Sequence, residues 1–324
     1  MDKKGNVVIL LSSYNGAEYI EKQLYCLIMQ DYVGKIQIVI RDDGSTDATV
    51  AIIKRMRKEL RDGRIDNFFS KFREISLFCG KNHGPQDSFL QLIRTAPDAG
   101  YYFFADQDDL WDRDYVSTAV NTIKEREKQN KEPILHCCNY RLMEKGGKIV
   151  KLQAIEKKPL FSPLKMLFYN QVPGCCMSMN AMLLERLKKM NLRHVMMHDS
   201  FALSYACYAG RVLYTPTSYV SHRIHDNNVV GVGHKKIEPI SWVSDKWKLL
   251  QRKEPYDVSL MAREFIRVTN HAKYRGYYND VLLLAHFKES WKKTWELLSH
   301  PDTMDVWYDR TTLSIRAKIL LHLF

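Results

Sequence analysis

Three carboxylates follow a run of apolar residues about a third of the way along the chain. Asp106, Asp108 and Asp109 come directly after residues 101–105, whose sequence Tyr-Tyr-Phe-Phe-Ala is typical of a buried strand. Two carboxylates one residue apart can share one hard divalent cation, and a diphosphate can fill the ligand positions that the protein leaves open. The alternative is a solvated acidic turn before a helix. Asp109 either caps that helix or supports the other two carboxylates.

Polar clusters also follow two earlier apolar runs. Residues 12–16 (Ser-Ser-Tyr-Asn-Gly) come after the run at residues 7–11, and residues 42–47 (Asp-Asp-Gly-Ser-Thr-Asp) come after the run at residues 36–40. An open α/β sheet binds its ligands at the carboxyl ends of its strands. The pattern therefore predicts that these two clusters and the three carboxylates lie at one edge of a sheet.

Two further polar positions lie much later in the chain. His198 and Asp199 stand at the head of an apolar helical segment. Asp199 either caps this helix by accepting from backbone N–H groups, or faces the carboxylate cleft and accepts the proton of an attacking hydroxyl. His225, in a polar loop predicted at residues 218–230, is either a surface histidine or a neutral imidazole ligand for manganese.

Alternating strands and helices precede the three carboxylates. Short β-branched runs without alternation predict parallel strands that are covered on both faces, and apolar residues at helical spacing predict the helices between them. The predicted strands are residues 7–11, 36–40, 75–78 and 101–105, and the predicted helices are residues 19–28, 46–60 and 88–93. This order indicates a doubly wound nucleotide-binding sheet.

The second half of the chain has fewer regular patterns. Helices are predicted at residues 115–129, 181–190 and 201–208, strands at 133–138, 172–180 and 212–214, and a hairpin turn at 144–147. From residue 235 onward only helices are predicted, so we expect one domain at residues 1–234 and a helical region at 235–324.

Two apolar stripes run along the predicted C-terminal helices. Their members are Phe287, Trp291, Trp295 and Leu298 in one stripe, and Leu313, Ala317, Leu320 and Phe324 in the other. We expect the stripes to pack against their own domain. The alternative is that they lie in a membrane interface, because tryptophan and flanking basic residues suit that environment.

The composition is that of a soluble globular protein with an excess of basic residues. The 324 residues contain 49 Lys and Arg against 37 Asp and Glu, a formal net charge of +12, which predicts an anionic partner such as nucleic acid, a membrane face or a phosphorylated substrate.

Seven cysteines without zinc or disulfide spacing indicate reduced, mostly buried thiols. No apolar run is long enough to span a membrane. The absence of Gly-rich phosphate loops disfavours kinases, GTPases and classical dehydrogenases.

Six spaced motifs together resemble the family 2 glycosyltransferases of GT-A fold, and within them the bacterial rhamnosyltransferase-like subgroup. The first three are the polar clusters at residues 12–16, 42–47 and 105–111 (Ala-Asp-Gln-Asp-Asp-Leu-Trp). The later ones are Gly174-Cys175, His198-Asp199-Ser200 and the loop at residues 223–231. The resemblance covers residues 7–231 and implies a mixed α/β sheet flanked by helices. The helices predicted from residue 235 onward would form a C-terminal appendage to it.

The resemblance implies a role for each matching residue. Asp199 would be the general base, and Asp108 and His225, with Asp106, would hold Mg²⁺ or Mn²⁺ against the donor diphosphate. The nucleotide sugar would be bound by Ser12, Tyr14, Asn15, Asp42, Asp43, Asp106 and Gln107. The acceptor side would be formed by Trp111, Gly174, His198 and Arg223, although a core position is an equal alternative for Trp111.

The predicted function is an inverting, metal-dependent glycosyl transfer. The donor that the resemblance implies is dTDP-rhamnose or another nucleotide sugar, and the acceptor is a polyprenyl-diphosphate-linked glycan in cell wall or capsule biosynthesis. The expected location is the cytoplasm, with peripheral contact to the inner membrane face and with homo-oligomerisation as an option. One alternative is a non-catalytic nucleotide-sugar-binding partner in a polysaccharide assembly complex. Nucleic-acid binding is disfavoured, because the basic residues are spread over helix faces without interleaved aromatics.

Overall fold

A computed structural model describes residues 5–65, 68–191, 195–224, 257–269, 276–304, 316 and 319–322. The chain forms two compact units. Unit 1 consists of Met1–Pro159, Val172–Lys188 and Gly210–His225, and unit 2 of Leu160–Gln171, Lys189–Ala209 and Asp226–Phe324. The predicted domain boundary at residue 234 falls outside the described residues and stays a prediction.

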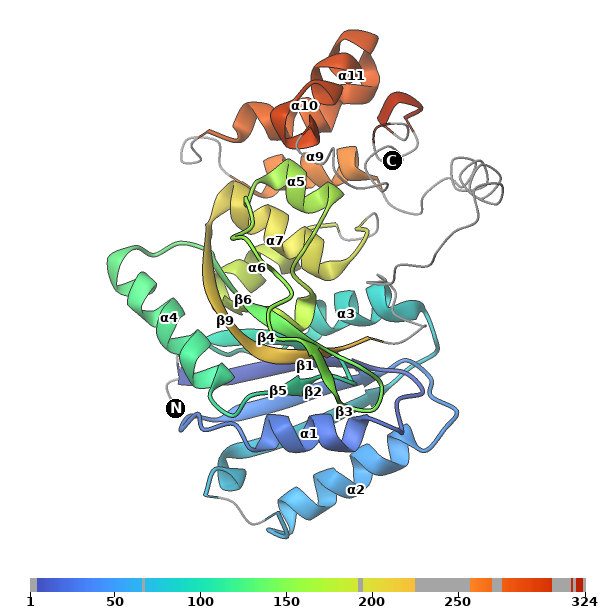
Figure 1. The fold of residues 1–324 in the computed structure, drawn as a ribbon, viewed down its shortest axis with the longest axis vertical. Coiled ribbons are helices and arrows are strands. Elements are labelled where there is room, and N and C mark those ends of the chain that lie inside the picture. The colour runs from blue at the N-terminus through green and yellow to red at the C-terminus, as the bar shows by residue number, and fades with distance from the viewer. Residues whose placement is uncertain are drawn as a thin grey trace. The chain divides into compact units, whose positions relative to one another are not determined.

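Unit 1 is built on one mixed sheet, to which the described part of the chain contributes nine strands (Figure 1). The order is β3-β2-β1-β4-β8-β6-β9-β5, and β7 pairs with β6 outside this path. Strands β3, β2, β1 and β4 are parallel, whereas β8 runs antiparallel between β4 and β6. The strands are β1 (Val7–Ser13), β2 (Ile36–Asp42), β3 (Arg73–Cys79), β4 (Tyr101–Ala105), β5 (Leu110–Trp111), β6 (Ile134–Met143), β7 (Ile149–Lys151), β8 (Met177–Asn180) and β9 (Arg211–Arg223).

The central strands are buried along almost their whole length. All five residues of β4 are buried, and β1 and β2 each have one residue of intermediate exposure. Runs of Val, Ile, Leu and Phe without alternation have this outcome, because helices cover both faces of such a sheet. In Figure 1, α1 (Ile20–Ile28) and α2 (Thr49–Arg61) lie on one side of the sheet, and α3 (Gly84–Thr95) lies on the other.

The remaining helices of unit 1 agree with the apolar spacing. The predicted helix at residues 115–129 is α4 (Tyr115–Gln129), and α6 (Ala181–Lys188) begins where predicted. The short turns η2 (Ser70–Phe72) and η3 (Gly174–Cys176) complete the unit. The hairpin turn predicted at 144–147 joins β6 to β7, and Gly147 has the positive φ of 91° that favours glycine in such a turn.

Two predictions for the later strands were wrong. Residues 218–223, expected in a loop, belong to β9, which pairs with β6 and β5. The register between β6 and β9 shifts after Cys138, so Pro216 and Thr217 have no partner in the β6 register and the strand continues beyond them. The strand predicted at 172–180 is a 3₁₀ turn followed by β8, because the chain turns after Pro173.

Unit 2 is helical where it is described. Its helices are α5 (Pro163–Phe168), α7 (His198–Ala209), α9 (Val258–Val268), α10 (Tyr278–His286), the 3₁₀ turn η5 (Phe287–Glu289), α11 (Trp291–Leu298) and α12 (Pro301–Met304). Phe265 of α9 is buried in a cluster with the aromatic rings of α7, namely Phe201, Tyr205 and Tyr208. No helix among the described residues is long and apolar enough to cross a membrane.

The first apolar stripe of the C-terminal region divides between the core and the surface. Phe287 and Leu298 are buried, as predicted, but Trp291 and Trp295 are 63% and 60% exposed. Trp291 stacks on the ring of His322, with 5.7 Å between the ring centroids, and leaves most of its own surface exposed. Helix α11 instead buries Thr294, Leu297 and Leu298. Of the second stripe only Leu320 is described, and it is exposed; Leu313, Ala317 and Phe324 lie outside the described residues.

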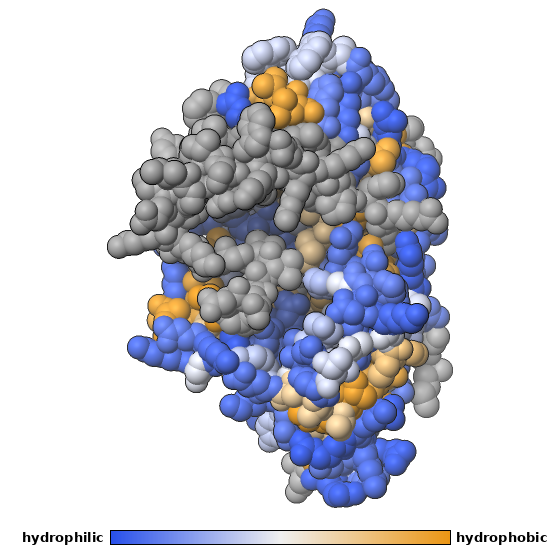
Figure 2. Space-filling view, turned by 90° about the vertical axis from the view of Figure 1, so that its right-hand side faces the viewer, coloured by the Kyte–Doolittle hydropathy of each residue, from blue (hydrophilic) through white to orange (hydrophobic). Residues whose placement is uncertain are grey.

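All seven cysteines lie in the described ranges, and none forms a disulfide. Four of them, Cys137, Cys138, Cys175 and Cys176, are buried, as predicted. Among the residues that Figure 2 colours, hydrophilic ones predominate on this face and hydrophobic ones form separate patches.

Candidate functional site

The polar clusters that follow β1, β2 and β4 meet at one edge of the sheet in unit 1. Ser13 at the end of β1 pairs with Asp42 at the end of β2, and Leu11 of β1 pairs with Ala105 at the end of β4. The parallel register therefore places the ends of the three strands side by side. This is the arrangement that the strand pattern predicted.

Hydrogen bonds join the first two clusters to each other. The buried Asp42 carboxylate accepts from the Ser13 hydroxyl at 3.0 Å and from the Ser45 amide at 2.9 Å. Asn15, which has a positive φ of 46°, accepts from the Thr46 amide at 2.8 Å through its side-chain oxygen. Each turn therefore holds the other in one conformation.

Asp43, the residue that follows β2, has a structural partner within that strand. Its carboxylate accepts from Arg41 Nη1 at 2.5 Å, and both side chains are buried. The same carboxylate accepts from the amides of His83 and Gly84 at the start of α3. A carboxylate at a helix N-terminus satisfies free amides and interacts well with the helix dipole. Asp43 therefore links the end of β2 to α3.

The segment at residues 106–109, which we call the acidic loop, is anchored from two other elements. Gln23 of α1 donates to the Asp106 carbonyl at 3.0 Å. The Gln107 side chain accepts from the Tyr14 amide at 2.9 Å and donates to the Tyr14 carbonyl at 3.0 Å. Gly16 makes room for this side chain, since a Cβ atom there would lie 2.1 Å from Gln107 Oε1.

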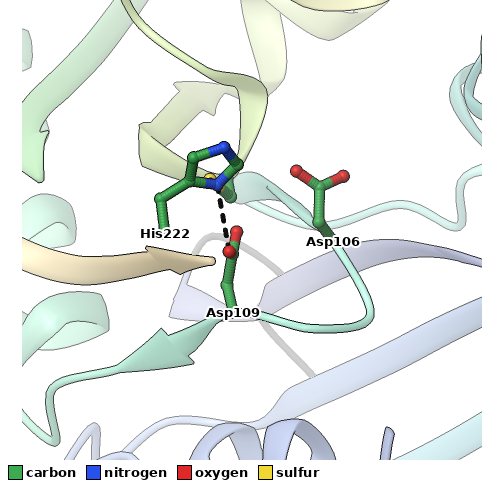
Figure 3. Close-up of side chains that lie close together, drawn as sticks. Asp106, Asp109 and His222 are labelled. Carbon is green, nitrogen blue, oxygen red and sulfur yellow. Dashed lines mark hydrogen bonds and ion pairs between the residues drawn. The ribbon is translucent and has the colours of Figure 1, made fainter. Parts of the chain in front are cut away.

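Asp109 does not begin a helix, so the capping alternative for it is wrong. It precedes β5, is fully buried, and accepts from His222 Nδ1 at 3.0 Å (Figure 3). Burial raises the pKa of the Asp109 carboxyl, but attraction to His222 and hydrogen bonds overcome it and hold the pKa below its usual range. Burial lowers the pKa of His222, but Asp109 outweighs it and raises that pKa well above its usual range. The two side chains therefore form a buried ion pair at neutral pH.

Four side chains at this place could supply ligands to a metal ion. Ligand atoms of Asp106, Asp109, Cys175 and His222 all lie within 4.8 Å of one another. The Cys175 thiol is buried 3.7 Å from His222 Nδ1, and burial raises its pKa to about 11. Asp109 and His222 are already neutralised by each other. Asp106 is partly exposed. It lies beside this ion pair (Figure 3), so its carboxylate is the one of the four groups that suits a divalent cation with oxygen ligands.

The other predicted donor-side residues lie along the same edge. Ser12 donates to the Ser88 hydroxyl at 2.6 Å, and Tyr14 is 44% exposed. The Asp108 carbonyl accepts from Arg223 Nε at 2.9 Å. His225, the predicted third metal ligand, lies outside the described residues.

The predicted acceptor-side residues divide between the two units. Trp111 is 4% exposed and packs against Phe103 and Tyr115, and Gly174 is buried in η3. Arg223 is also in unit 1 and is 4% exposed. The remaining residue of this set, His198, belongs to unit 2. Their roles toward an acceptor stay predictions.

His198 and Asp199 belong to unit 2, at the start of α7. His198 is buried, and burial lowers its pKa to about 3, so it is neutral at ordinary pH. The Asp199 carboxylate accepts from the Ser200 amide at 2.6 Å. The assignment of Asp199 as a general base stays a prediction.

Sequence reasoning missed three residues that support the acidic loop. Gln23 resembles any polar residue on an amphipathic helix, and its contact with Asp106 spans 83 positions. Cys175 was recognised as part of a motif, but nothing in its spacing pointed to His222. His222 was assigned to a loop, whereas the alternation of β9 turns it toward Asp109.

Comparisons with known proteins agree on the family. The family model described as "Glycosyl transferase family 2" matches residues 8–189. The chain is 26% identical to the dTDP-rhamnosyl transferase RfbG of Shigella flexneri over 296 residues, which cover 87% of this chain and 93% of that protein.

Solved structures show the fold. TarS of S. aureus in complex with UDP is similar with a TM-score of 0.53 and 16% identity, over 97% of this chain and 83% of that one. The mannosyltransferase PcManGT from Pyrobaculum calidifontis, in complex with GDP-Man and Mn²⁺, is similar with a TM-score of 0.51 and 16% identity, over 98% and 85%. The fold is therefore GT-A, as the motifs implied. Since the family model covers more than half of the chain, the protein belongs to glycosyl transferase family 2.

Proposed function

We propose that this glycosyltransferase transfers rhamnose from dTDP-rhamnose, with inversion and with the help of a divalent metal ion. The observation that carries the proposal is the acidic loop, which is held at the carboxyl edge of the parallel strands by contacts from α1, from the turn after β1 and from β9. The identity of the sugar and of the nucleotide is supported by the similarity to a dTDP-rhamnosyl transferase over most of both chains.

The donor would lie across the turns that follow β1, β2 and β4. Tyr14 offers an exposed ring for stacking, and Asp42 sits at the shared edge of β1 and β2 as a candidate partner for the base. The donor-binding residues that we propose are Ser12, Tyr14, Asn15, Asp42, Asp43, Asp106 and Gln107. The UDP and GDP-Man complexes of the structural relatives support a nucleotide-sugar donor.

Asp106 and Asp108, with His225, would hold Mg²⁺ or Mn²⁺. These are oxygen and imidazole ligands, which suit both ions, and one relative was solved with Mn²⁺. When bound, the ion supplies positive charge that stabilises the departing diphosphate.

Asp199 would act as the general base. It would accept the proton of an acceptor hydroxyl while the hydroxyl oxygen forms a bond to the anomeric carbon of the sugar. The bond between that carbon and the diphosphate oxygen breaks in the same step, so the configuration inverts. Trp111, Gly174 and His198 are the proposed acceptor-side residues, whereas the guanidinium of Arg223 is buried and bonded to the backbone of the acidic loop.

The proposed acceptor is a polyprenyl-diphosphate-linked glycan of the cell envelope. We propose that the protein works in the cytoplasm at the inner membrane face, as a monomer or as a homo-oligomer. The net charge of +12 and the exposed Trp291 and Trp295 support contact with an anionic membrane.

A panel of nucleotide sugars tests the donor assignment. We expect dTDP-rhamnose with Mn²⁺ to raise the unfolding temperature more than UDP- or GDP-linked sugars do, because a ligand that binds only the folded state stabilises it. A larger shift with another nucleotide sugar would contradict the rhamnose assignment. Donor binding without any transfer to a lipid-linked acceptor would instead favour a non-catalytic partner in glycan assembly.

A further inference from the structure

The acidic loop is held from behind by the last residue of β9. Arg223 is 4% exposed, and its Nε donates to the carbonyl oxygen of Asp108 at 2.9 Å. Its Nη1 donates to the carbonyl oxygens of Lys145 at 2.7 Å and Glu144 at 3.1 Å, in the turn between β6 and β7. One buried guanidinium therefore ties the acidic loop to a second, separate turn.

Asp109 provides the other half of this connection. Its Oδ1 accepts from the backbone amide of Arg223 at 3.0 Å and from His222 Nδ1 at 3.0 Å. Asp108 and Asp109, two consecutive residues of the acidic loop, are thus bonded to two consecutive residues of β9. A shift of the loop along β9 would break bonds at both positions.

We infer that Asp109, His222 and Arg223 form a latch that positions Asp108 toward the metal and the donor diphosphate. This inference rests on the proposed function of Asp108 as a metal ligand. The three are positioning residues, because they are buried or nearly so and act through the backbone on either side of the proposed ligand. Fixing the Asp108 carbonyl limits the directions in which the carboxylate of the same residue can point. A site loses affinity for its metal ion when the groups that orient its ligands are removed.

The chemistry of the latch favours a positioning role over simple core packing. Buried ion pairs stabilise a fold no better than apolar residues of similar volume, because removing charges from water is costly. The bonds of this latch nevertheless converge on the residues next to the proposed metal ligand. The Arg223 guanidinium also lies over the Tyr19 ring, with 4.6 Å between its central carbon and the ring centroid, so its orientation is restricted.

Arg141 of β6 provides a matched control. Its guanidinium also bonds to β9, donating to the Ser221 hydroxyl and the Ser218 carbonyl at 3.0 Å, and it pairs with Asp112. These partners lie in β9 and at Asp112, outside the acidic loop, so a lysine at position 141 perturbs the same strand without touching the latch. R141K therefore measures the effect of replacing a guanidinium that is bonded to β9 while the bonds of the latch stay intact.

Calorimetric titration of dTDP, with and without Mn²⁺, tests the latch in the full-length chain. The proteins are the wild type, R223K, D109N and R141K, each first shown by circular dichroism and thermal melting to be folded. We expect Mn²⁺ to tighten dTDP binding to the wild type and R141K. In R223K and D109N the gain from Mn²⁺ should fall about tenfold, the usual effect of losing a hydrogen bond to a charged group. Binding of dTDP without metal should stay within about twofold, since the latch acts only through the metal ligand.

The other results would overturn the inference in distinguishable ways. If R223K and D109N keep the full gain from Mn²⁺, or if they lose metal-free binding equally, the three residues are structural and the latch is refuted. If dTDP binds the wild type equally well with and without Mn²⁺, the proposed metal site fails and the latch fails with it. If the wild type does not bind dTDP under either condition, the proposed donor nucleotide is wrong as well.

Discussion

A single methyl group at Gly16 should disturb the anchor of the acidic loop. An alanine Cβ at this position would lie 2.1 Å from Gln107 Oε1 and 2.4 Å from Gln107 Cδ, far inside the contact distance of these atoms. The Gln107 side chain is flexible, so it would move aside. In doing so it would lose both of its hydrogen bonds to the backbone of Tyr14.

The expected cost is small but measurable. Two hydrogen bonds at about 0.5–1.5 kcal/mol each contribute about 1–3 kcal/mol. Replacing glycine with alanine stabilises a protein by about 0.4–1 kcal/mol through the unfolded chain, which offsets part of the loss. The net destabilisation of G16A should be about 1 kcal/mol, and the unfolding temperature should fall by about 2–4 °C.

Urea unfolding of a double-mutant cycle with Q107A measures this effect. If the clash with Gln107 is the cause, G16A should stabilise the protein by about 0.4–1 kcal/mol when Gln107 is already alanine. The coupling energy should then equal the lost hydrogen bonds, about 1–3 kcal/mol. Gly146, where an added Cβ would meet no atom within 4 Å, is the control position, and G146A should not lower stability. Equal costs of G16A in both backgrounds would refute the reasoning.

Three further predictions concern the ion pair, the exposed tryptophans and the metal. The lowered pKa of Asp109 means that its stabilising contribution is present above its usual value of 3.8 and is lost as the pH falls through the folded-state value. The raised pKa of His222 means that its contribution is present below 6.5 and is lost as the pH rises through the folded-state value. The stability difference between wild type and D109N in urea should therefore be largest near neutral pH and shrink in acid, and a difference independent of pH would contradict the ion pair. The W291A/W295A variant should bind vesicles with anionic lipid about tenfold more weakly in a sedimentation assay, because two interfacial rings are lost; unchanged binding would exclude these rings as the contact. EDTA should stop sugar transfer, Mn²⁺ should restore it, and full activity after exhaustive chelation would remove the metal role of Asp106 and Asp108.

The parallel half of the sheet was predictable because its signals are local. The runs at β1, β2 and β4 are apolar and continuous, so they identify buried strands, and the polar residues behind them mark the functional edge. The helix α4 has the bounds that its apolar spacing predicts.

The strand β9 was not predictable beyond Tyr214 for a physical reason. Pro216 lacks an N–H group and interrupts the pattern, and the residues after it are mostly polar. Their pairing depends on a register shift against β6, whose partner residues are 79 or 80 positions away in the chain. The positions of His222 and Arg223 beside Asp109 depend on that pairing, so the sequence alone could not place them.

The face that α11 buries was also ambiguous from sequence. Periodicity shows that apolar residues share one side of a helix, but Thr294, Leu297 and Leu298 form a second such side, and the structure buries this one. Trp291 and Trp295 are left exposed as a result. Only the packing of the neighbouring helices decides between two such faces.

The most direct test of the proposed function is sugar transfer by the wild type and by D199N, measured side by side. The assay would follow the release of dTDP from dTDP-rhamnose with Mn²⁺ and the appearance of labelled rhamnose on a polyprenyl-diphosphate-linked glycan. We expect the wild type to form product, and D199N to bind the donor normally but to transfer at least about 100-fold more slowly, as befits the loss of a general base. Near-normal transfer by D199N would contradict the base assignment, and no transfer by the wild type would contradict the proposed reaction.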